Sequence, residues 1–274
     1  MNTINEHHKF LEHYAFLRIL GDVIDGHEVA PRGLKIKELN NYTYTLPPFA
    51  RLMNFESRKL NLDYIKREFL WYLKGDRYDT SICDHARMWI GLINGDGSIN
   101  SNYGQYVFGE QQQFWRVVKT LEDDKDSRRA SIMILNHEHL DSDTKDVPCT
   151  YAINFRIRDN KLHMTVHMRS QDAIFGMGND APAFSFIHEM MWQALKVKYE
   201  DLEYGDYFHV ADSFHVYERH FEMMEKIVRQ DDPFVPINVP RISGIEEVEF
   251  LSVAKFNDIP DEFEFTKWLH TYDK

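Results

Sequence analysis

Residues 151–168 read YAINFRIRDNKLHMTVHM, with apolar side chains at alternate positions on both sides of a central Asp159-Asn160 pair. Alternation of this kind places the apolar side chains on one face of a strand, and Asp and Asn are favoured in tight turns. The stretch therefore predicts a β-hairpin. One face would pack in the core, while the other face of the second strand, with His163, Thr165 and His167, would meet solvent, a partner or a ligand.

Helical and strand patterns also precede the hairpin. Residues 61–74 read as a helix that ends at Gly75, with apolar residues at core spacing and Glu68 on a neighbouring face that is otherwise aromatic. The run ASIMIL at 130–135 is continuously apolar, which predicts a short buried strand, and a pair of arginines stands at its entrance.

After the hairpin the patterns continue to interleave. Pro182 predicts the start of a second helix, because proline is favoured in a first turn. Residues 206–217 predict a strand plus a turn that leads into a helix at about 218–228, and the C-terminal part predicts a closing strand at 246–256 and a helix at 265–269. Strands and helices alternate without regular βαβ units, so the expected class is α+β.

The composition is that of a globular protein. The chain has 274 residues, of which 43% are hydrophobic and 28% charged, and its formal net charge is −12. No repeat, low-complexity tract or Gly/Ser linker divides it, so we expect one domain over residues 1–274. The negative charge argues against a general affinity for nucleic acid or anionic membranes. Any phosphate must therefore be met by a local cluster of arginines.

Targeting signals and a cysteine framework are both missing from the sequence. No apolar run approaches the roughly 20 residues of a membrane helix, and the start, MNTINEHHKF, is polar, so we expect a cytoplasmic protein. The two cysteines, Cys83 and Cys149, lie far apart, which leaves no disulfide framework or four-cysteine zinc site. The histidine spacing is poor for a metal, so no metal is expected.

Cys149, in the segment VPCTY just before the hairpin, is the candidate nucleophile. A nucleophilic cysteine needs positive charge near its thiolate, which Arg169 at the end of the hairpin could provide, together with Arg128 and Arg129. A lone cysteine is more commonly an inert small hydrophobe, and paired arginines are commonly a solvated charge run.

Seven colinear blocks between about Arg32 and His220 together resemble the thymidylate synthase family, and more closely its phage deoxycytidylate hydroxymethylase branch. The resemblance implies a thymidylate synthase-like fold, with a mixed sheet flanked by helices and two sheets packed back to back in a homodimer. The blocks are PRG, REFLWYLKG, MWIGLINGDGSINSNYG, DSRR, PCT, RSQDAIFG with GND, and HVADSFHVY.

The resemblance implies covalent catalysis with a folate co-substrate. Cys149 would add to C6 of a pyrimidine nucleotide, so that C5 attacks the one-carbon unit of 5,10-methylenetetrahydrofolate. Glu68 would order water and move protons. Trp89 and Tyr103 match positions that line the folate and nucleotide pocket, and Asp172 matches an aspartate that interacts with the pterin.

It also implies how the nucleotide is held. The phosphate would be bound by four arginines and a serine, and the sugar 3′-hydroxyl by a histidine and a tyrosine. Arg128 and Arg129 would reach across from the second subunit. The remaining matching residues in this sequence are Arg32, Arg169 and Ser170 for the phosphate, and His215 and Tyr217 for the sugar.

Departures from the synthase pattern suggest the substrate. Asp180 stands where synthases have an asparagine, whose amide matches uracil. An ionised carboxylate can only accept hydrogen bonds. It would therefore suit the N4 amino group and a protonated N3 of cytosine, and it would repel O4 of uracil. Helix capping is a compatible role for Asp180. Thr150 and Met168 also differ from the residues that synthases have at these positions, and both differences match the hydroxymethylase branch.

The end of the chain departs as well, since WLHTYDK differs from the apolar tail with which synthases close their site. This predicts that water, rather than hydride from the folate, completes the reaction and yields 5-hydroxymethyl-dCMP.

Several alternatives stay open within this resemblance. The enzyme could be a dCMP methylase, a CMP hydroxymethylase or a dUMP-acting relative, and the sequence does not report on the sugar 2′ position. A non-enzymatic alternative is an inactive paralogue that binds nucleotide or RNA, although intact Cys149, Glu68, Asp180 and arginines argue against it. Residues 232–274 match the family weakly.

Overall fold

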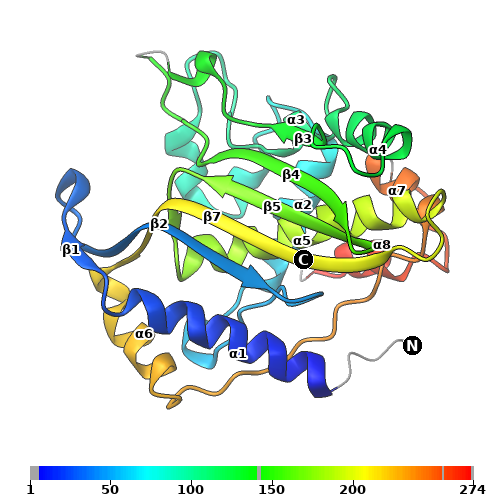
Figure 1. The fold of residues 1–274 in the computed structure, drawn as a ribbon. Helices are drawn as coiled ribbons and strands as arrows, with labels where there is room; N and C mark the ends of the chain where they lie inside the picture. Colours follow the sequence, from blue (N-terminus) through cyan, green and yellow to red (C-terminus); the bar gives the residue numbers. More distant parts are fainter. Residues whose placement is uncertain (1–5, 141–142, 255, 273–274) are drawn as a thin grey trace.

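The computed structural model describes residues 6–140, 143–254 and 256–272. At its centre is a seven-stranded sheet in the order β1-β2-β7-β5-β4-β3, with β6 paired to β7 (Figure 1). β5 and β6 run parallel to β7 and the other neighbours are antiparallel, so the sheet is mixed. The strands are β1 (His27–Val29), β2 (Ile36–Leu46), β3 (Ser131–Met133), β4 (Thr150–Arg158), β5 (Lys161–Met168), β6 (Gln171–Asp172) and β7 (Glu203–Tyr217).

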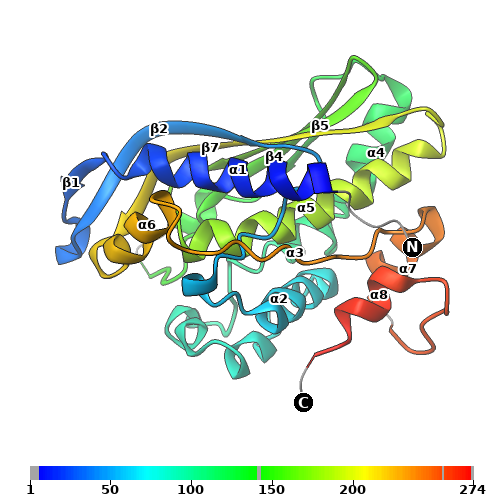
Figure 2. The ribbon, with the colours of Figure 1, turned by 90° about the horizontal axis from the view of Figure 1, so that it is seen from below.

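Helices flank the sheet, which confirms the predicted α+β class. The central helix α5 lies between the sheet and α2, and α1 runs alongside β2 and α6 (Figure 2). Phe184, Phe186 and Met190 of α5 are fully buried in the core. The helices are α1 (Glu6–Val23), α2 (Leu62–Lys74), α3 (Gly104–Val107), α4 (Gln113–Asp123), α5 (Phe175–Lys196), α6 (Phe221–Val228), α7 (Ile245–Ser252) and α8 (Glu264–Leu269).

The predicted hairpin is confirmed as β4 and β5. Asp159 and Asn160 both have positive φ, 50° and 57°, which is the backbone of a two-residue turn between antiparallel strands. Ile153, Phe155 and Ile157 are buried, as the alternation predicts.

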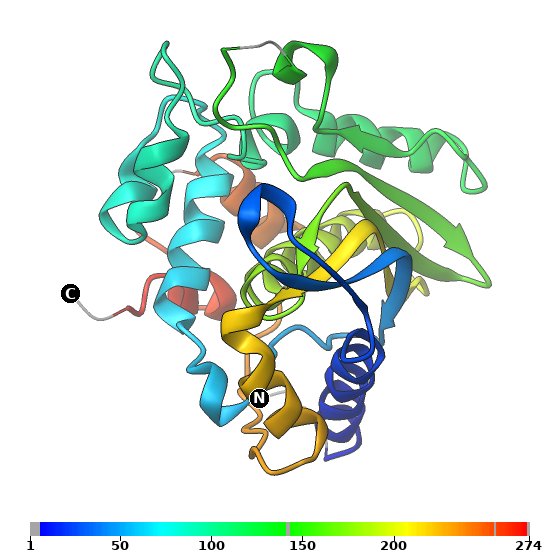
Figure 3. The ribbon, with the colours of Figure 1, turned by 90° about the vertical axis from the view of Figure 1, so that its left-hand side faces the viewer.

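The other face of the hairpin is polar and only partly covered. His163 and His167 are half-buried there, and the Arg156 guanidinium lies 5.5 Å from the ring centre of Phe208 on β7. Thr165, which shares this phase, is buried. In the view of Figure 3 the tip of the hairpin projects away from α2 and α8.

Two predicted element boundaries are wrong. The helix predicted from Pro182 begins seven residues earlier, at Phe175, because the Asp172 carboxylate accepts the N–H groups of Ile174, Phe175 and Gly176 and so caps the first turn. Pro182 therefore lies inside α5. The strand predicted to turn within 206–217 runs unbroken as β7, because β2 pairs with it along its length.

Two predicted strands also differ from the structure. The strand predicted at 246–256 is replaced by α7 over most of its length, since Val248 and Leu251, three residues apart, share one buried helical face. Lys255 lies outside the described residues. The strand predicted as buried at 130–135 is the short edge strand β3, whose Met133 is 55% exposed. The N-terminal helix α1 was not predicted.

Candidate active site

Glu68 stands on α2, the best predicted element. The Asn61 side chain caps its first turn by accepting from Tyr64 N, and Gly75 ends it with a φ of 61°. Glu68 is 4% exposed, and its Oε1 accepts a 2.6 Å hydrogen bond from the Tyr64 hydroxyl, which in turn accepts one of 3.0 Å from Trp89 Nε1. Burial raises the pKa of Glu68 to about 7. Near neutral pH this carboxyl can therefore both give and take a proton.

Cys149 lies just before β4 on a short segment that Arg169 holds. The Arg169 backbone N–H donates to Cys149 O at 2.8 Å, and its guanidinium donates to Val147 O at 2.8 Å and Pro148 O at 3.1 Å. Burial raises the pKa of the Cys149 thiol, while the charges of Arg169 and Arg32 oppose that rise. The same arginine thus fixes the backbone of Cys149 and favours its thiolate.

Asp146 anchors the segment that leads to Cys149. Its carboxylate accepts from Ser101 N at 2.6 Å and Ser101 Oγ at 2.5 Å, and its backbone oxygen accepts from Asn100 Nδ2 at 2.9 Å. Asp146 is fully buried. The segment that carries Cys149 is therefore attached on one side to the 98–102 loop and on the other to the sheet.

Asp180 projects from the second turn of α5 toward these groups. Burial first, and then the charge of Glu68, raise its pKa well above the ordinary value, and its own charge acts on Cys149. The three predicted catalytic residues thus lie close enough to influence one another. Burial disfavours the ionised carboxylate on which the argument from repulsion of uracil depends, and a protonated carboxyl group both donates and accepts.

The predicted phosphate ligands fall into two groups. Arg32, in an exposed loop at a φ of 53°, Arg169 and Ser170 belong to the Cys149 side, since the charges of both arginines act on the thiol. Arg128 and Arg129 precede β3, whose register with β4 places them beside residues 155–157. At about 3.3 Å per strand residue, residues 155–157 lie roughly 20 Å from Cys149 along β4. This distance is beyond the reach of an arginine side chain.

The predicted sugar ligands His215 and Tyr217 lie two residues apart on β7. Their rings stand perpendicular with centres 5.1 Å apart, and His215 pairs in register with Asp172 of β6. Burial lowers the pKa of His215, which keeps the imidazole neutral and able to donate or accept a hydrogen bond.

The residues predicted to contact the folate are two packed aromatic side chains and one carboxylate. The Trp89 ring centre is 5.2 Å from that of Trp71, and Tyr103 stacks on Phe184 at 6.0 Å. Asp172 is half-buried and accepts three backbone N–H groups, so one of the four carboxylate lone-pair positions stays available. This set fits a flat heterocycle with an N–H donor.

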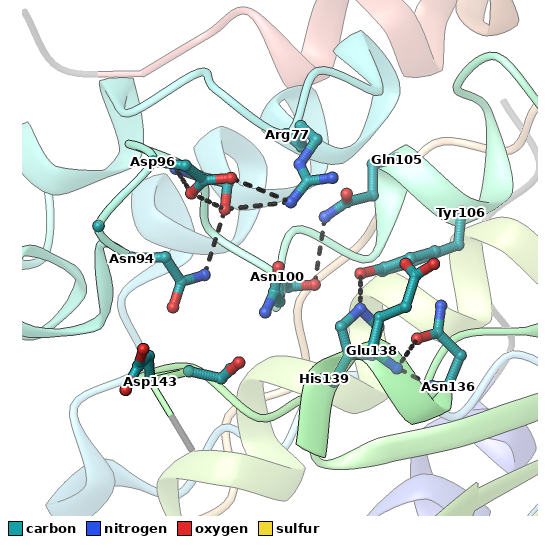
Figure 4. A pocket seen from close by; sticks show the side chains of 13 residues that line it. Arg77, Asn94, Asp96, Asn100, Gln105, Tyr106, Asn136, Glu138, His139 and Asp143 are labelled. Carbon is teal, nitrogen blue, oxygen red and sulfur yellow. Dashed lines mark hydrogen bonds and ion pairs between the residues drawn. The ribbon is translucent and has the colours of Figure 1, made fainter. Parts of the chain in front are cut away.

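A separate polar cavity of about 410 Å³ lies next to the Asp146 anchor, lined by Arg77, Tyr106, His139 and several amides. Figure 4 shows the Tyr106 hydroxyl at His139 Nε2, 2.8 Å away, and Gln105 reaching toward Asn100. None of the predicted site residues lines this cavity.

Within the described ranges, no group of three or more His, Cys, Asp or Glu side chains is arranged to hold a metal ion. No helix in those ranges is long and apolar enough to cross a bilayer.

Comparison with known proteins agrees with this geometry. The family model described as thymidylate synthase matches residues 36–261. The chain belongs to the thymidylate synthase family. This family member is 31% identical over 220 residues to the deoxyuridylate hydroxymethyltransferase of Bacillus phage SP01. The aligned region covers 74% of the chain and 56% of that relative. It is also 31% identical over 176 residues to the deoxycytidylate 5-hydroxymethyltransferase of Enterobacteria phage T4. Here the aligned region covers 61% of the chain and 71% of that relative.

The chain spans little more than half the length of the SP01 relative. Both relatives are named as phage hydroxymethyltransferases, and methylenetetrahydrofolate is the one-carbon donor that the thymidylate synthase family uses. Two residues of the site were not predicted from sequence: Tyr64 and Asp146. Only Tyr64 carried a signal, since it shares the helical face of Glu68 four residues away.

Proposed function

We propose that this protein transfers a one-carbon unit from 5,10-methylenetetrahydrofolate to C5 of dCMP and that water completes the reaction to 5-hydroxymethyl-dCMP. The observation that carries the proposal is Asp180, a half-buried carboxyl group close enough to Glu68 and Cys149 for their charges to interact. The folate supplies the one-carbon unit, and the chain's own residues bind the base, add to it and move protons.

The nucleophile is Cys149, whose sulfur forms a bond to C6 of the base and makes C5 nucleophilic. Arg169 supports this step because its charge stabilises the thiolate against the effect of burial. Its hydrogen bonds to Val147 and Pro148 also fix the backbone from which the thiol projects.

Glu68 is the proton carrier and the group that orders the final water. With a pKa of about 7, the carboxyl is a weak enough acid to accept a proton from water and a strong enough acid to return it. Tyr64 occupies one oxygen of Glu68, which leaves the other oxygen to face the reacting centre.

Asp180 selects the base. In its protonated form, which burial favours, it can donate its hydrogen to N3 of cytosine and accept from the N4 amino group. Transfer of that hydrogen to N3 gives a carboxylate facing two N–H donors, and such charge-assisted pairs are stronger than neutral hydrogen bonds.

The C-terminal segment supports entry of water. Lys66 Nζ donates to Thr271 O at 2.6 Å, and the Arg67 guanidinium lies 3.8 Å from the ring centre of Tyr272. Lys66 and Arg67 stand on a flank of α2 different from that of Glu68. The described segment up to Tyr272 therefore packs beside the helix and not over Glu68.

The same proposal includes a homodimer in which Arg128 and Arg129 complete the partner's phosphate site. Both side chains are exposed, and neither makes a hydrogen bond or ion pair within the described part of the chain. Their separation from Cys149 of the same chain, argued above from strand register, supports donation to a second copy through the open face of the sheet.

Hydroxymethylation of dUMP is the second candidate function. It is favoured by the named activity of the SP01 relative and by the raised pKa of Asp180, which weakens the repulsion expected with uracil.

Substitution of Asp180 separates the two candidates. An amide cannot supply an acidic hydrogen to N3, so Asp180→Asn should lower kcat/KM for dCMP by about 100-fold or more and should raise it for dUMP, measured for both nucleotides in the same preparation. If dUMP is the true substrate, the wild-type protein will prefer it and the substitution will not reverse a cytosine preference.

A further inference from the structure

Glu38 of β2 lies across the sheet from His215 of β7, one of the two predicted sugar ligands. The strands β2 and β7 are neighbours (Figure 1), and Glu38 pairs in register with His215. Register partners of an antiparallel pair carry their side chains on the same face, with Cβ atoms about 5 Å apart. The half-buried Glu38 carboxyl and the buried His215 ring are therefore neighbours on one face of the sheet.

Ser213, two residues before His215, joins these two side chains. Its hydroxyl donates to Glu38 Oε1, and its Oγ lies 3.4 Å from His215 Nδ1, at the long end of hydrogen-bond distances. An ionised carboxylate can only accept, so the single hydroxyl hydrogen of Ser213 is given to Glu38. The serine oxygen can then only accept from the imidazole. This arrangement requires a hydrogen on Nδ1 of His215.

The electrostatics around His215 agree with a hydrogen on Nδ1. Burial lowers the pKa of His215, and the charge of Asp172, a hydrogen bond to the Ser213 backbone and the charge of Glu38 oppose that lowering. The three opposing groups share one property, since each is a hydrogen-bond acceptor, and acceptors stabilise a ring N–H.

A neutral imidazole carries one hydrogen, so a hydrogen on Nδ1 leaves Nε2 as a bare acceptor. Two backbone hydrogen bonds hold this part of β7: Ser213 N donates to Arg169 O at 3.3 Å, and Ala173 N donates to His215 O at 2.7 Å. The Tyr217 ring stands perpendicular to that of His215, with ring centres 5.1 Å apart. A sugar hydroxyl that donates to Nε2 keeps its oxygen free to accept from the tyrosine O–H.

We propose that Glu38 and Ser213 are positioning residues for recognition of the sugar, which keep the hydrogen of His215 on Nδ1 and leave Nε2 as the acceptor for the 3′-hydroxyl. The inference rests on the proposed nucleotide substrate and on the predicted role of His215 as a sugar ligand. It adds the direction of the hydrogen bond: the sugar donates and the imidazole accepts. A nucleotide without a 3′-hydroxyl would leave this buried nitrogen unpaired.

¹⁵N NMR of the full-length protein, labelled at the histidine ring nitrogens and free of nucleotide, tests the position of the hydrogen. Loss of signals in His215→Gln identifies the ring. At pH 8 we expect a neutral His215 with its hydrogen on Nδ1 in the wild-type protein, and a larger fraction of the Nε2–H form in Ser213→Ala. A wild-type ring with its hydrogen on Nε2 would overturn the inference, whichever nucleotide is the substrate.

Calorimetric binding, without folate, of dCMP and of 2′,3′-dideoxycytidine monophosphate tests the role in recognition. The two nucleotides differ only in the 3′-hydroxyl. The wild-type protein should bind dCMP about tenfold more tightly, and Ser213→Ala should reduce this ratio by about three- to fivefold while its affinity for the dideoxynucleotide stays unchanged. A purely structural role would weaken both nucleotides equally. Ser213→Thr keeps the hydroxyl and should keep the wild-type ratio.

Ser252→Ala is the matched control, because Ser252 is also a half-buried serine and donates to Glu249 O at 2.9 Å on α7. It should leave both affinities unchanged.

Glu38→Met is the second variant, which also serves if Ser213→Ala does not fold. It removes the acceptor of the Ser213 hydrogen, so that the hydroxyl can donate to Nδ1, and the ratio should fall in the same direction. An unchanged ratio in the variants that fold, or a wild-type protein that binds both nucleotides equally, would overturn the inference. If the protein prefers dUMP, the cytosine function fails, and the same comparison with dUMP and its dideoxy analogue decides the role of Glu38 and Ser213.

Discussion

At the scale of single residues, the site places two carboxyl groups where ionisation is costly. Glu68 is buried and Asp180 half-buried; loss of solvent raises the pKa of both carboxyl groups, and the charge of Glu68 raises that of Asp180 further. A protein gains nothing in stability from such a pair, so its presence at the helix face next to Cys149 is best explained by chemistry.

Glu68→Gln should therefore stabilise the fold while it abolishes turnover. The folded pKa of about 7 lies above the ordinary value of 4.5, so the folded state is penalised once Glu68 ionises. The penalty is absent below pH 4.5, grows as the pH rises to 7, and is then constant at roughly 3 kcal/mol.

Urea unfolding of both proteins at pH 8 and pH 5 measures this effect. The variant should be more stable by roughly 3 kcal/mol at pH 8 and by less than about 1 kcal/mol at pH 5. An equal difference at the two pH values would show that ionisation of Glu68 is not its source.

At the scale of elements, α2 shows why some parts of the fold could be predicted and others not. Its start at Asn61 and stop at Gly75 are local signals, as is the Asp159-Asn160 turn of the hairpin. The start of α5 could not be predicted in the same way. Its cap, Asp172, is separated from Pro182 by a glycine-bearing stretch typical of a loop, and its partner strands come from distant sequence.

Gly75→Ala tests whether this helix end needs glycine. The residue has a φ of 61°, and a Cβ atom there would stand 2.9 Å from Gly109 N, which is backbone and cannot rotate away. We expect a loss of roughly 2 kcal/mol or more in the free energy of unfolding. Gly91→Ala, where a Cβ meets nothing within 4 Å, is the control and should change stability by less than about 0.5 kcal/mol.

The residues of the candidate site also fall into those that could be predicted from sequence and those that could not. The family resemblance indicates Cys149, Glu68 and Asp180, and the structure places their charges within reach of one another. Asp146 is held by hydrogen bonds to a segment far away in sequence, so its partner, Ser101, becomes visible only in three dimensions.

At the scale of the whole molecule, the proposed dimer predicts that sites are shared. An Arg128→Ala/Arg129→Ala chain and a Cys149→Ser chain should each be nearly inactive alone. After subunit exchange, half of the dimers are hybrids with one intact site of two, so the mixture should regain about a quarter of the wild-type activity. If mixing restores nothing although exchange is complete, the arginines serve their own chain or no site at all.

The central claim is that cytosine is hydroxymethylated and the folate is not oxidised. The most direct measurement is mass analysis of an equimolar mixture of dCMP and dUMP incubated with the wild-type protein and methylenetetrahydrofolate, with dihydrofolate absorbance followed in parallel. We predict a gain of CH₂O on dCMP alone and no dihydrofolate. A gain of CH₂ with dihydrofolate formation, or a product from dUMP alone, would contradict the account.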